Sequence, residues 1–219
     1  WATKTGTARL VLKFIDRLLV FFATTIIVDS YSQNEFLVQQ KILMNGQGLV
    51  LKDGSISGVD LKRFRPNAQA RKSVRATLGL SDDVFVLLFL GRIKREKGVI
   101  DLVESFTLLR KSLEHVCLVL VGPDEENLQS ELHKKLGADA GHAHFVPFVE
   151  FPEIYMAAAD LFVLPSHREG FGSVVIEAAA CGLPAVVSRI YGLSDAVEDN
   201  CSGILVDVKD VEALATAMK

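Results

Sequence analysis

The sequence predicts an α/β fold with a mostly parallel sheet, and three observations lead to this prediction. Short apolar runs alternate with helical segments through most of the chain. Two of the runs, residues 84–90 and 116–121, are apolar without interruption, as is typical of central strands that are buried on both faces. Both runs end at a glycine turn, Gly91 and Gly122. Because ligands of such sheets bind beyond the carboxyl ends of the strands, the loops after these runs are candidate binding sites.

Composition limits the size and class of the protein. The 219 residues, 49% hydrophobic and 23% charged, suffice for one large or two small cores. A net charge of −3 implies no basic face and argues against a nucleic-acid partner. Three cysteines without a C-x-x-C spacing favour reduced thiols in the cytosol. Since the longest apolar stretch, residues 18–28, is shorter than the about 20 residues of a spanning helix, and no signal segment opens the chain, we expect a soluble fragment of a longer protein.

Residues 9–22 have the period of an amphipathic helix. The apolar positions are Leu10, Phe14, Leu18 and Phe21, and Lys13 and Arg17 lie on another side. We favour a core-facing helix with two solvated cations. The alternative is peripheral association of this helix with an anionic membrane surface.

The rest of residues 1–60 predicts the end of an α/β domain. A β-branched strand over residues 25–28 is followed by a helix over 31–41, which Asp29 and Ser30 precede as capping residues. A short strand at 48–51 completes a strand–helix–strand order. Glycine and serine from residue 54 onward, followed by Pro66, then indicate an interdomain linker, which we assign to residues 61–67.

Residues 68–219 are predicted to form a second, Rossmann-like domain. The expected helices are 68–78, 99–113, 124–136, 152–159, 173–180 and 210–218, and the expected strands are 84–90, 116–121, 144–146, 161–164, 184–188 and 203–206. The first helix carries Arg71, Lys72 and Arg75, which we expect to be solvated. Cys117 and Cys181 lie in or beside apolar elements, and we expect both to pack in the core.

The loop GRIKREKG, residues 91–98, is the first candidate binding segment. It follows a buried strand and is dense in cations, which are therefore placed to meet a phosphate. It matches neither the G-x-G-x-x-G dinucleotide loop nor the P-loop, so neither dinucleotide nor NTPase chemistry is indicated.

The second candidate segment is PSHREGFGSVVIEAAACGLPAVV, residues 165–187. The amides of Gly172, Ser173 and Val174 would open a helix, and a helix N-terminus binds anions. Glu169 and Glu177 flank this point with the spacing E-x7-E. Carboxylates repel phosphate but accept hydrogen bonds from sugar hydroxyls. An anion pocket with two hydroxyl acceptors fits a nucleotide sugar.

Three pieces of the chain resemble the donor-binding signature of the retaining family-4 glycosyltransferases, which have the GT-B fold. They are PSHREGFG, the helix ending EAAACGLP, and GLSDAVEDNCSGILV. The linker GS-x-x-GVD and the loop GRIKREKG resemble the subgroup that builds capsular and lipid-linked glycans from UDP-N-acetylhexosamines. The resemblance implies that the chain is the C-terminal, donor-binding half of such an enzyme, with the tail of the preceding acceptor-side domain.

The resemblance also implies roles for individual residues. Glu169 would contact the transferred sugar and Glu177 the ribose, while Arg92 and Lys97 would hold the pyrophosphate and stabilise the departing diphosphate. The donor-binding backbone would come from Gly91, from Phe171, Gly172, Ser173 and Val174 at the helix start, and from Val149 near the base. Pro147 stands where the family usually has glycine, and it has no amide hydrogen to offer the base.

The implied reaction transfers a sugar, an N-acetylhexosamine or a hexose, from a nucleoside diphosphate to an acceptor hydroxyl with retention of configuration. We expect UDP as the nucleotide, a glycan or lipid-linked acceptor, no metal or other cofactor, and a cytoplasmic location, with the inner membrane face as the place of any peripheral association. His167 lies near Glu169 and receives no role. Because the family's first domain supplies a glycine-rich loop and the acceptor site, we expect the chain alone to bind donor weakly without turnover. The alternatives are a GT-B nucleotide-sugar epimerase, which needs no E-x7-E, and a catalytically inactive donor-binding module.

Overall fold

A doubly wound parallel sheet forms the larger part of the molecule. The structure, a computed structural model, describes residues 5–219. Its main sheet contains β3 (Phe85–Leu90), β4 (Val116–Val121), β5 (Ala143–Val146), β6 (Leu161–Leu164), β7 (Ala185–Ser188) and β8 (Gly203–Val206). These strands pair in parallel in the order β5-β4-β3-β6-β7-β8. The predicted α/β class is therefore confirmed, and the strand order reverses between β3 and β6.

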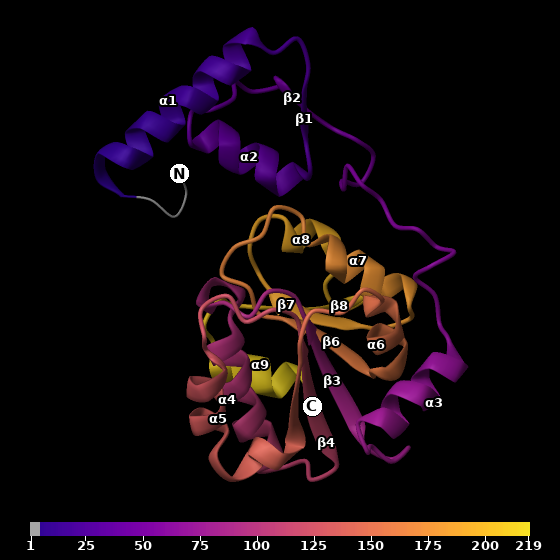
Figure 1. Cartoon of the computed structure of the whole chain (residues 1–219). Helices are drawn as coiled ribbons and strands as arrows, with labels where there is room; N and C mark the ends of the chain where they lie inside the picture. Colours follow the sequence, from indigo (N-terminus) through magenta and orange to yellow (C-terminus); the bar gives the residue numbers. More distant parts are fainter. Residues whose placement is uncertain (1–4) are drawn as a thin grey trace.

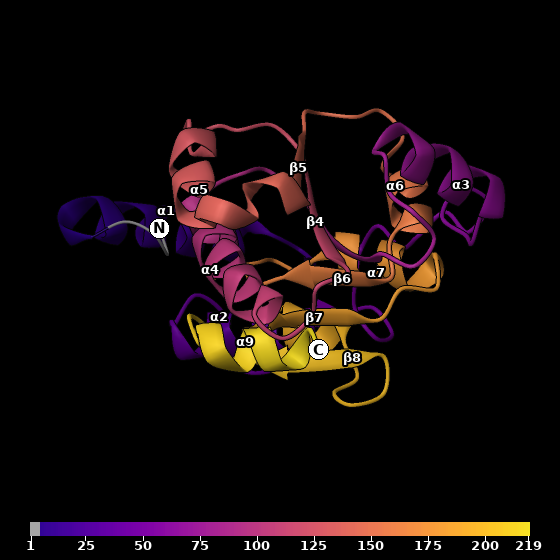
Figure 2. The same ribbon diagram turned by 90° about the horizontal axis from the view of Figure 1, so that it is seen from below.

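Helices cover both faces of this sheet (Figures 1 and 2). One face is covered by α3 (Ala68–Thr77), α6 (Pro152–Ala158) and α7 (Ser173–Ala180), and the other by α4 (Val99–Arg110), α5 (Gln129–Leu136) and α9 (Val211–Ala217). A short helix, α8 (Leu193–Ala196), and 3₁₀ turns at Arg95–Lys97 and Gly137–His142 were not predicted. They are too short to show a period in the sequence.

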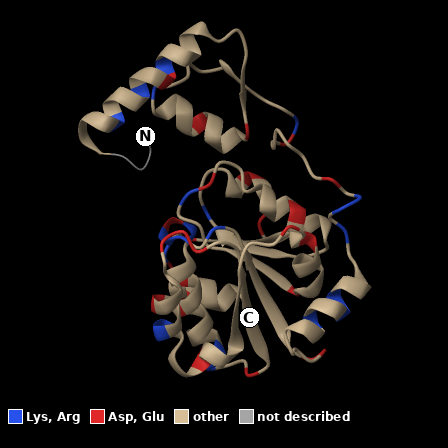
Figure 3. Cartoon of the chain, viewed as in Figure 1, with Lys and Arg blue, Asp and Glu red and all other residues tan. Residues whose placement is uncertain are grey.

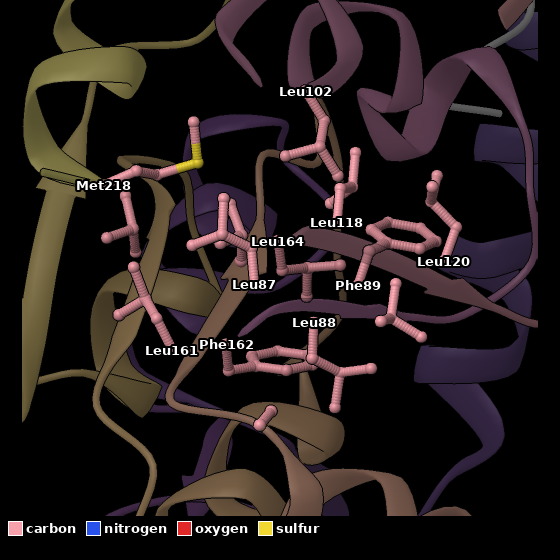
Figure 4. Packing of buried hydrophobic residues seen from close by; sticks show 14 of the residues in the cluster. Leu87, Leu88, Phe89, Leu102, Leu118, Leu120, Leu161, Phe162, Leu164 and Met218 are labelled. Carbon is pink, nitrogen blue, oxygen red and sulfur yellow. The ribbon is translucent and has the colours of Figure 1, made fainter. Parts of the chain in front are cut away.

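The core lies where the central strands meet these helices (Figure 4). Successive side chains of a strand point to opposite faces, so a strand covered on both sides buries all of them. Leu87, Leu88 and Phe89 of β3 are no more than 1% exposed, and Phe162 of β6 is fully buried. Cys117 and Cys181 are also buried, as predicted, and burial raises the pKa of each thiol to about 11.

A smaller unit precedes the main sheet. It consists of α1 (Gly6–Phe22), β1 (Ile26–Val28), α2 (Tyr31–Gln39) and β2 (Gly48–Val50), and its two strands are parallel. Ser30 caps α2 by accepting from the amide of Gln33, 3.2 Å away. Residues 51–67 follow this unit, and they form turns without a helix or a strand. The division into 1–60, 61–67 and 68–219 stays a prediction, and its first four residues lie outside the described range.

The predicted helix at residues 9–22 is confirmed, but its orientation differs from the one we favoured. Its cations face α2: Lys13 Nζ lies 2.8 Å from Gln40 Oε1, and Arg17 Nε lies 2.7 Å from the carbonyl oxygen of Lys41. The carbonyls at a helix C-terminus attract cations, so the polar side of α1 turns inward. Within the described residues α1 buries no side chain, and Phe14 and Phe21 are 64% and 79% exposed. No helix of residues 5–219 is long and apolar enough to cross a membrane.

The other predicted elements are confirmed with small shifts at their ends, apart from the helix at 124–136. It begins only at Gln129. The carboxylate of Asp124 accepts from the amides of Leu128 and Gln129, each at 2.9 Å, and from that of Glu126 at 3.3 Å. These local bonds compete with helical ones, as is usual for aspartate.

The prediction that Arg75 is solvated is wrong. Its side chain is 2% exposed and lies 3.3 Å from Asp160 Oδ2. It also donates to the carbonyls of Ser81, Val84 and Ala158. Asp160, immediately before β6, accepts in addition from Arg71 at 2.7 Å and from the amide of Val86 at 2.8 Å. A buried charge requires such partners, and this cluster fastens α3 to β3 and β6.

Candidate functional site

Two loops meet where the strand order reverses. Residues 91–98 follow β3 and residues 165–172 follow β6, and these two strands are hydrogen-bonded neighbours. The loops touch at Gly98, whose φ is +69° and where a Cβ would lie 1.9 Å from the carbonyl oxygen of Pro165. Only glycine fits this contact. The sheet topology thus brings together the two segments that the sequence singled out, at the position where doubly wound proteins bind ligands.

A cavity of about 400 Å³ lies between these loops and α7. It is lined by nine of the ten predicted site residues, namely Gly91, Arg92, Lys97, Glu169, Phe171, Gly172, Ser173, Val174 and Glu177. The tenth, Val149, lines a second cavity of about 400 Å³. Gly91 and Arg92 border both cavities, so the two are contiguous.

The second cavity is apolar. Its lining comprises Leu90, Gly91, Arg92, Val121, Gly122, Pro123, Phe148, Val149 and Pro152. The ring of Phe148 is 73% exposed, which is unusual for a large apolar side chain beside a cavity. A flat, weakly polar group would suit this surface.

A larger cavity of about 700 Å³ lies at the opposite end of the sheet, among Val84, Arg110, Val116 and His144. Its cation is already engaged, since Arg110 Nε lies 3.2 Å from Asp139 Oδ1. Burial lowers the pKa of His144, which favours an uncharged ring there. Position at the amino ends of the strands and a neutralised cation both argue against a site for an anionic ligand.

The cations of the first cavity already face carboxylates. Lys97 Nζ lies 2.5 Å from Glu169 Oε1, with both side chains no more than 15% exposed. Arg92 is half exposed and lies 3.6 Å from Glu125 Oε2, which Lys94 also contacts at 2.6 Å. The hydrogen bond from Lys94 lowers the pKa of Glu125. Figure 3 shows charged segments of both signs at this end of the sheet, facing the upstream unit.

The start of α7 presents backbone donors to the same cavity. Gly172, at φ +77°, immediately precedes the helix, and a Cβ there would lie 2.4 Å from Leu193 Cδ2. Glycine therefore permits the turn that brings Ser173 and Val174 to the cavity wall. An N-terminus with unpaired amides and a positive dipole end favours an anion at this place.

Glu177 lies one turn into α7, is half-buried, and has a carboxyl group with a raised pKa. Burial raises the pKa of its carboxyl, the nearby Arg63 opposes the rise, and Glu153 adds to it. Arg63 itself lies 2.9 Å from Glu153 Oε2 and 2.8 Å from the carbonyl oxygen of Glu150. Arg63, which precedes the main sheet in the sequence, therefore lies close enough to Glu177 to affect its pKa.

We expect Glu177→Gln to stabilise the chain at pH 7. Because the folded pKa lies above the ordinary value of 4.5, stability falls as pH rises through the window between the two values, and the cost persists above it. Glutamine avoids this cost, so its advantage should vanish below about pH 4. Urea midpoints at pH 7 and pH 4 measure the difference. Glu35→Gln on an exposed face of α2 is the control, and equal midpoints for wild type and Glu177→Gln at pH 7 contradict the expectation.

Several residues of this region were missed by sequence reasoning. Ser166 is fully buried and donates to Glu169 Oε1 at 2.9 Å. His167, which received no role, lies 2.6 Å from Asp101 Oδ2. Ser166 and His167 could have been predicted because they lie close to Glu169 in the sequence. Asp101, Arg63 and Phe148 are far from Glu169 in the sequence, and only the fold brings them to this region.

The upstream unit contacts residues 191–195, which are in turn linked to the Glu169 loop. The amide of Ser32 in α2 donates to Asp195 Oδ2 at 3.1 Å, and its hydroxyl accepts from the amide of Gly192 at 2.8 Å. The ring of Phe36 stacks on Tyr191 with 4.5 Å between centroids. Tyr191 Oη in turn accepts from Arg168 Nε at 3.2 Å, so α2 is linked to the residue beside Glu169.

The part of the chain that the structure describes contains no cluster of side chains suited to bind a metal ion. Within residues 5–219, no group of three or more His, Cys, Asp or Glu side chains is arranged to hold a metal ion. The independence from metal and cofactor that the sequence suggested stays a prediction.

Comparisons with known proteins all point to the same family. The family model described as "Glycosyl transferases group 1" matches residues 70–219. A D-inositol 3-phosphate glycosyltransferase of Saccharomonospora viridis is 40% identical over 176 residues, which cover 74% of this chain and 39% of that protein. The capsular polysaccharide biosynthesis glycosyltransferase CapM of Staphylococcus aureus is 29% identical, over 97% of this chain and 56% of CapM.

Solved structures agree with this match. Sucrose-phosphate synthase from Thermosynechococcus elongatus superposes with a TM-score of 0.81 and 30% identity, over 99% of this chain and 54% of that one. Anabaena HepE in complex with UDP and glucose superposes with a TM-score of 0.79 and 25% identity, over 94% of this chain and 56% of HepE. The chain therefore spans between 39% and 56% of the lengths of these four proteins.

Proposed function

Because the chain belongs to the group 1 glycosyl transferase family, we propose that its switch-point cavity binds the donor, a UDP-sugar, and that the whole protein transfers the sugar to an acceptor hydroxyl with retention of configuration. The observation that carries the proposal is the meeting of two cations, a helix N-terminus and two carboxylates around one cavity. The cations and the helix N-terminus suit a diphosphate, and the two carboxylates suit the hydroxyls of the ribose and the sugar.

Each group has a distinct task in this proposal. Arg92, Lys97 and the amides at the start of α7 hold the diphosphate, and Glu177 accepts from a ribose hydroxyl. Glu169 accepts from a hydroxyl of the transferred sugar. During transfer the bond between the anomeric carbon and the diphosphate oxygen breaks, and its electron pair goes to that oxygen. The acceptor oxygen bonds to the carbon, and its proton passes to the departing diphosphate oxygen. The cations stabilise the charge that develops on the diphosphate.

The apolar cavity beside Arg92 is the proposed position of the base. Its lining includes Val149, the exposed ring of Phe148, Gly122 and Pro123. UDP is our choice of nucleotide because HepE, with 25% identity, was crystallised with UDP and with UDP-glucose. The aromatic wall can stack on the ring of the base, and stacking of this kind tolerates different bases.

The pathway and place are further parts of the proposal. CapM, by its name, belongs to capsular polysaccharide biosynthesis, so we propose an N-acetylhexosamine or hexose as the sugar and a glycan or lipid-linked acceptor. Among the described residues all three cysteines are free thiols, which supports a cytoplasmic location. The exposed apolar side of α1 is the surface on which peripheral association with the inner membrane face would depend.

Activity assays separate this proposal from its alternatives. We expect the 219-residue chain to bind UDP-sugar weakly and to show no transfer, and the whole protein to form product with the anomeric configuration of the donor. An epimerase would instead convert the sugar nucleotide without acceptor and would keep its activity in Glu169→Gln and Glu177→Gln. Donor binding without transfer by the whole protein would indicate an inactive binding module, and transfer by the chain alone would contradict the need for the acceptor side.

A further inference from the structure

Two kinds of contact hold the loop 165–172 against the loop 91–98 and the start of α4. The pair Lys97–Glu169 uses side chains that line the donor cavity. The others avoid the cavity: the amide of His167 donates to the carbonyl oxygen of Glu96 at 2.8 Å, and His167 Nε2 lies 2.6 Å from Asp101 Oδ2. Contacts of the first kind compete with a ligand, and those of the second kind do not.

The His167–Asp101 pair is well placed to last through ligand binding. Its side chains are 27% and 15% exposed, so water screens the pair only partly. Asp101 lies in the first turn of α4, where the helix dipole favours a carboxylate. The pair therefore fixes the Glu169 loop to a rigid helix. Neither residue lines the cavity of Glu169 or the one beside it.

Donor binding would break the contact between Lys97 and Glu169, and this step rests on the proposed function. Lys97 would turn to the diphosphate and Glu169 to a sugar hydroxyl, so the 2.5 Å contact between them would be lost. Glu169 would then keep Ser166 as a partner within its own loop. The position of the loop relative to Lys97 would depend on the contacts outside the cavity.

We propose that His167 and Asp101 are positioning residues for sugar recognition. They hold residues 165–170 against the start of α4, so that Glu169 stays directed at the transferred sugar after Lys97 has left it. The effect is specific for the sugar part of the donor. The diphosphate contacts come from side chains of the loop after β3 and from amides at the start of α7, whereas the imidazole of His167 is bonded to Asp101 of α4.

A second His–Asp pair offers a matched control. His115 Nδ1 lies 3.1 Å from Asp83 Oδ2, with side chains 70% and 64% exposed. This pair is at the amino ends of β3 and β4, far from the loops of the donor cavity. Replacement of either member removes the same chemical groups without touching the Glu169 loop.

The test is calorimetric titration of the chain with UDP and with UDP-glucose or UDP-N-acetylglucosamine, whichever the wild type binds more tightly. We expect His167→Ala and Asp101→Asn to weaken binding of the sugar nucleotide by about tenfold or more, since small misplacements at a site have large effects. Binding of UDP should change by less than about twofold. His167→Gln, whose amide can donate to Asp101, should restore much of the loss, and His115→Ala and Asp83→Asn should bind like the wild type.

The outcomes separate the two levels of inference. Equal weakening of UDP and sugar nucleotide in His167→Ala would show a general structural role and overturn the positioning role, as would unchanged binding of both. Failure of the folded wild type to bind either nucleotide would overturn the proposed function and this inference with it. Loss confined to the sugar nucleotide supports both.

Discussion

Replacing Asp160 by alanine is expected to lower the free energy of unfolding by about 3–5 kcal/mol, because it leaves a buried guanidinium without its counter-charge. Arg75 is 2% exposed and pairs with Asp160 at 3.3 Å. The same carboxylate accepts from Arg71 and from the amide of Val86, so α3, β3 and β6 lose a common partner at once. Urea unfolding followed by far-UV circular dichroism measures the change at constant m-value.

Two variants make this result interpretable. Asp160→Asn keeps an oxygen for the amide of Val86 and should lose less stability than Asp160→Ala. Asp83→Ala removes a carboxylate that is 64% exposed, and surface changes of this kind have little effect on stability. If Asp160→Ala were no less stable than Asp83→Ala, the cluster around Arg75 would not support the fold as we describe.

Arg92→Ala and Lys97→Ala are each expected to weaken UDP binding about 10- to 100-fold, the effect of losing a hydrogen bond to a charged group. Both side chains line the cavity at the end of β3. The loss should shrink at high salt, because the half-exposed Arg92 interacts through partly screened charge. Isothermal titration at low and high ionic strength measures both effects.

Arg95→Ala is the matched control for this pair. Arg95 lies in the same loop and has the same charge, but its guanidinium contacts Glu131 of α5 and lines neither the cavity of Glu169 nor the apolar one beside it. Arg95→Ala should bind UDP like the wild type. Similar affinities for all three variants would mean that the loop attracts the nucleotide only by its total charge, and the assignment of Arg92 and Lys97 would fail.

Period and composition were sufficient for the elements that bury a continuous face. The run at 84–90 could only be a central strand, and Phe85–Leu90 is the middle of the sheet. Short pieces such as α8 (Leu193–Ala196) form through tertiary contacts and have no period to detect. The predicted helix at 124–136 begins late, at Gln129, because the carboxylate of Asp124 accepts from nearby amides, which a hydrophobic pattern does not show.

The candidate site was predictable where chemistry is concentrated in the chain. Glu169, the glycines and the start of α7 lie within one short segment, and the cation loop follows a buried strand. Arg75 was misjudged because a basic helix is usually solvated, and its partner Asp160 is far away in sequence. The inward turn of Lys13 and Arg17 was missed for the same reason, since it depends on carbonyls at the end of α2.

The most direct test of the central claim is to map UDP on the ¹⁵N-labelled chain by amide chemical shifts. If the switch-point cavity is the donor site, UDP should shift the amides of Gly91, Gly172, Ser173 and Val174 in a saturable way. The amides around the larger cavity at the amino ends of the strands, such as Gly79 and Gly141, should stay in place. Shifts confined to that opposite cavity, or no shifts in a folded sample, would contradict the assignment of the donor site.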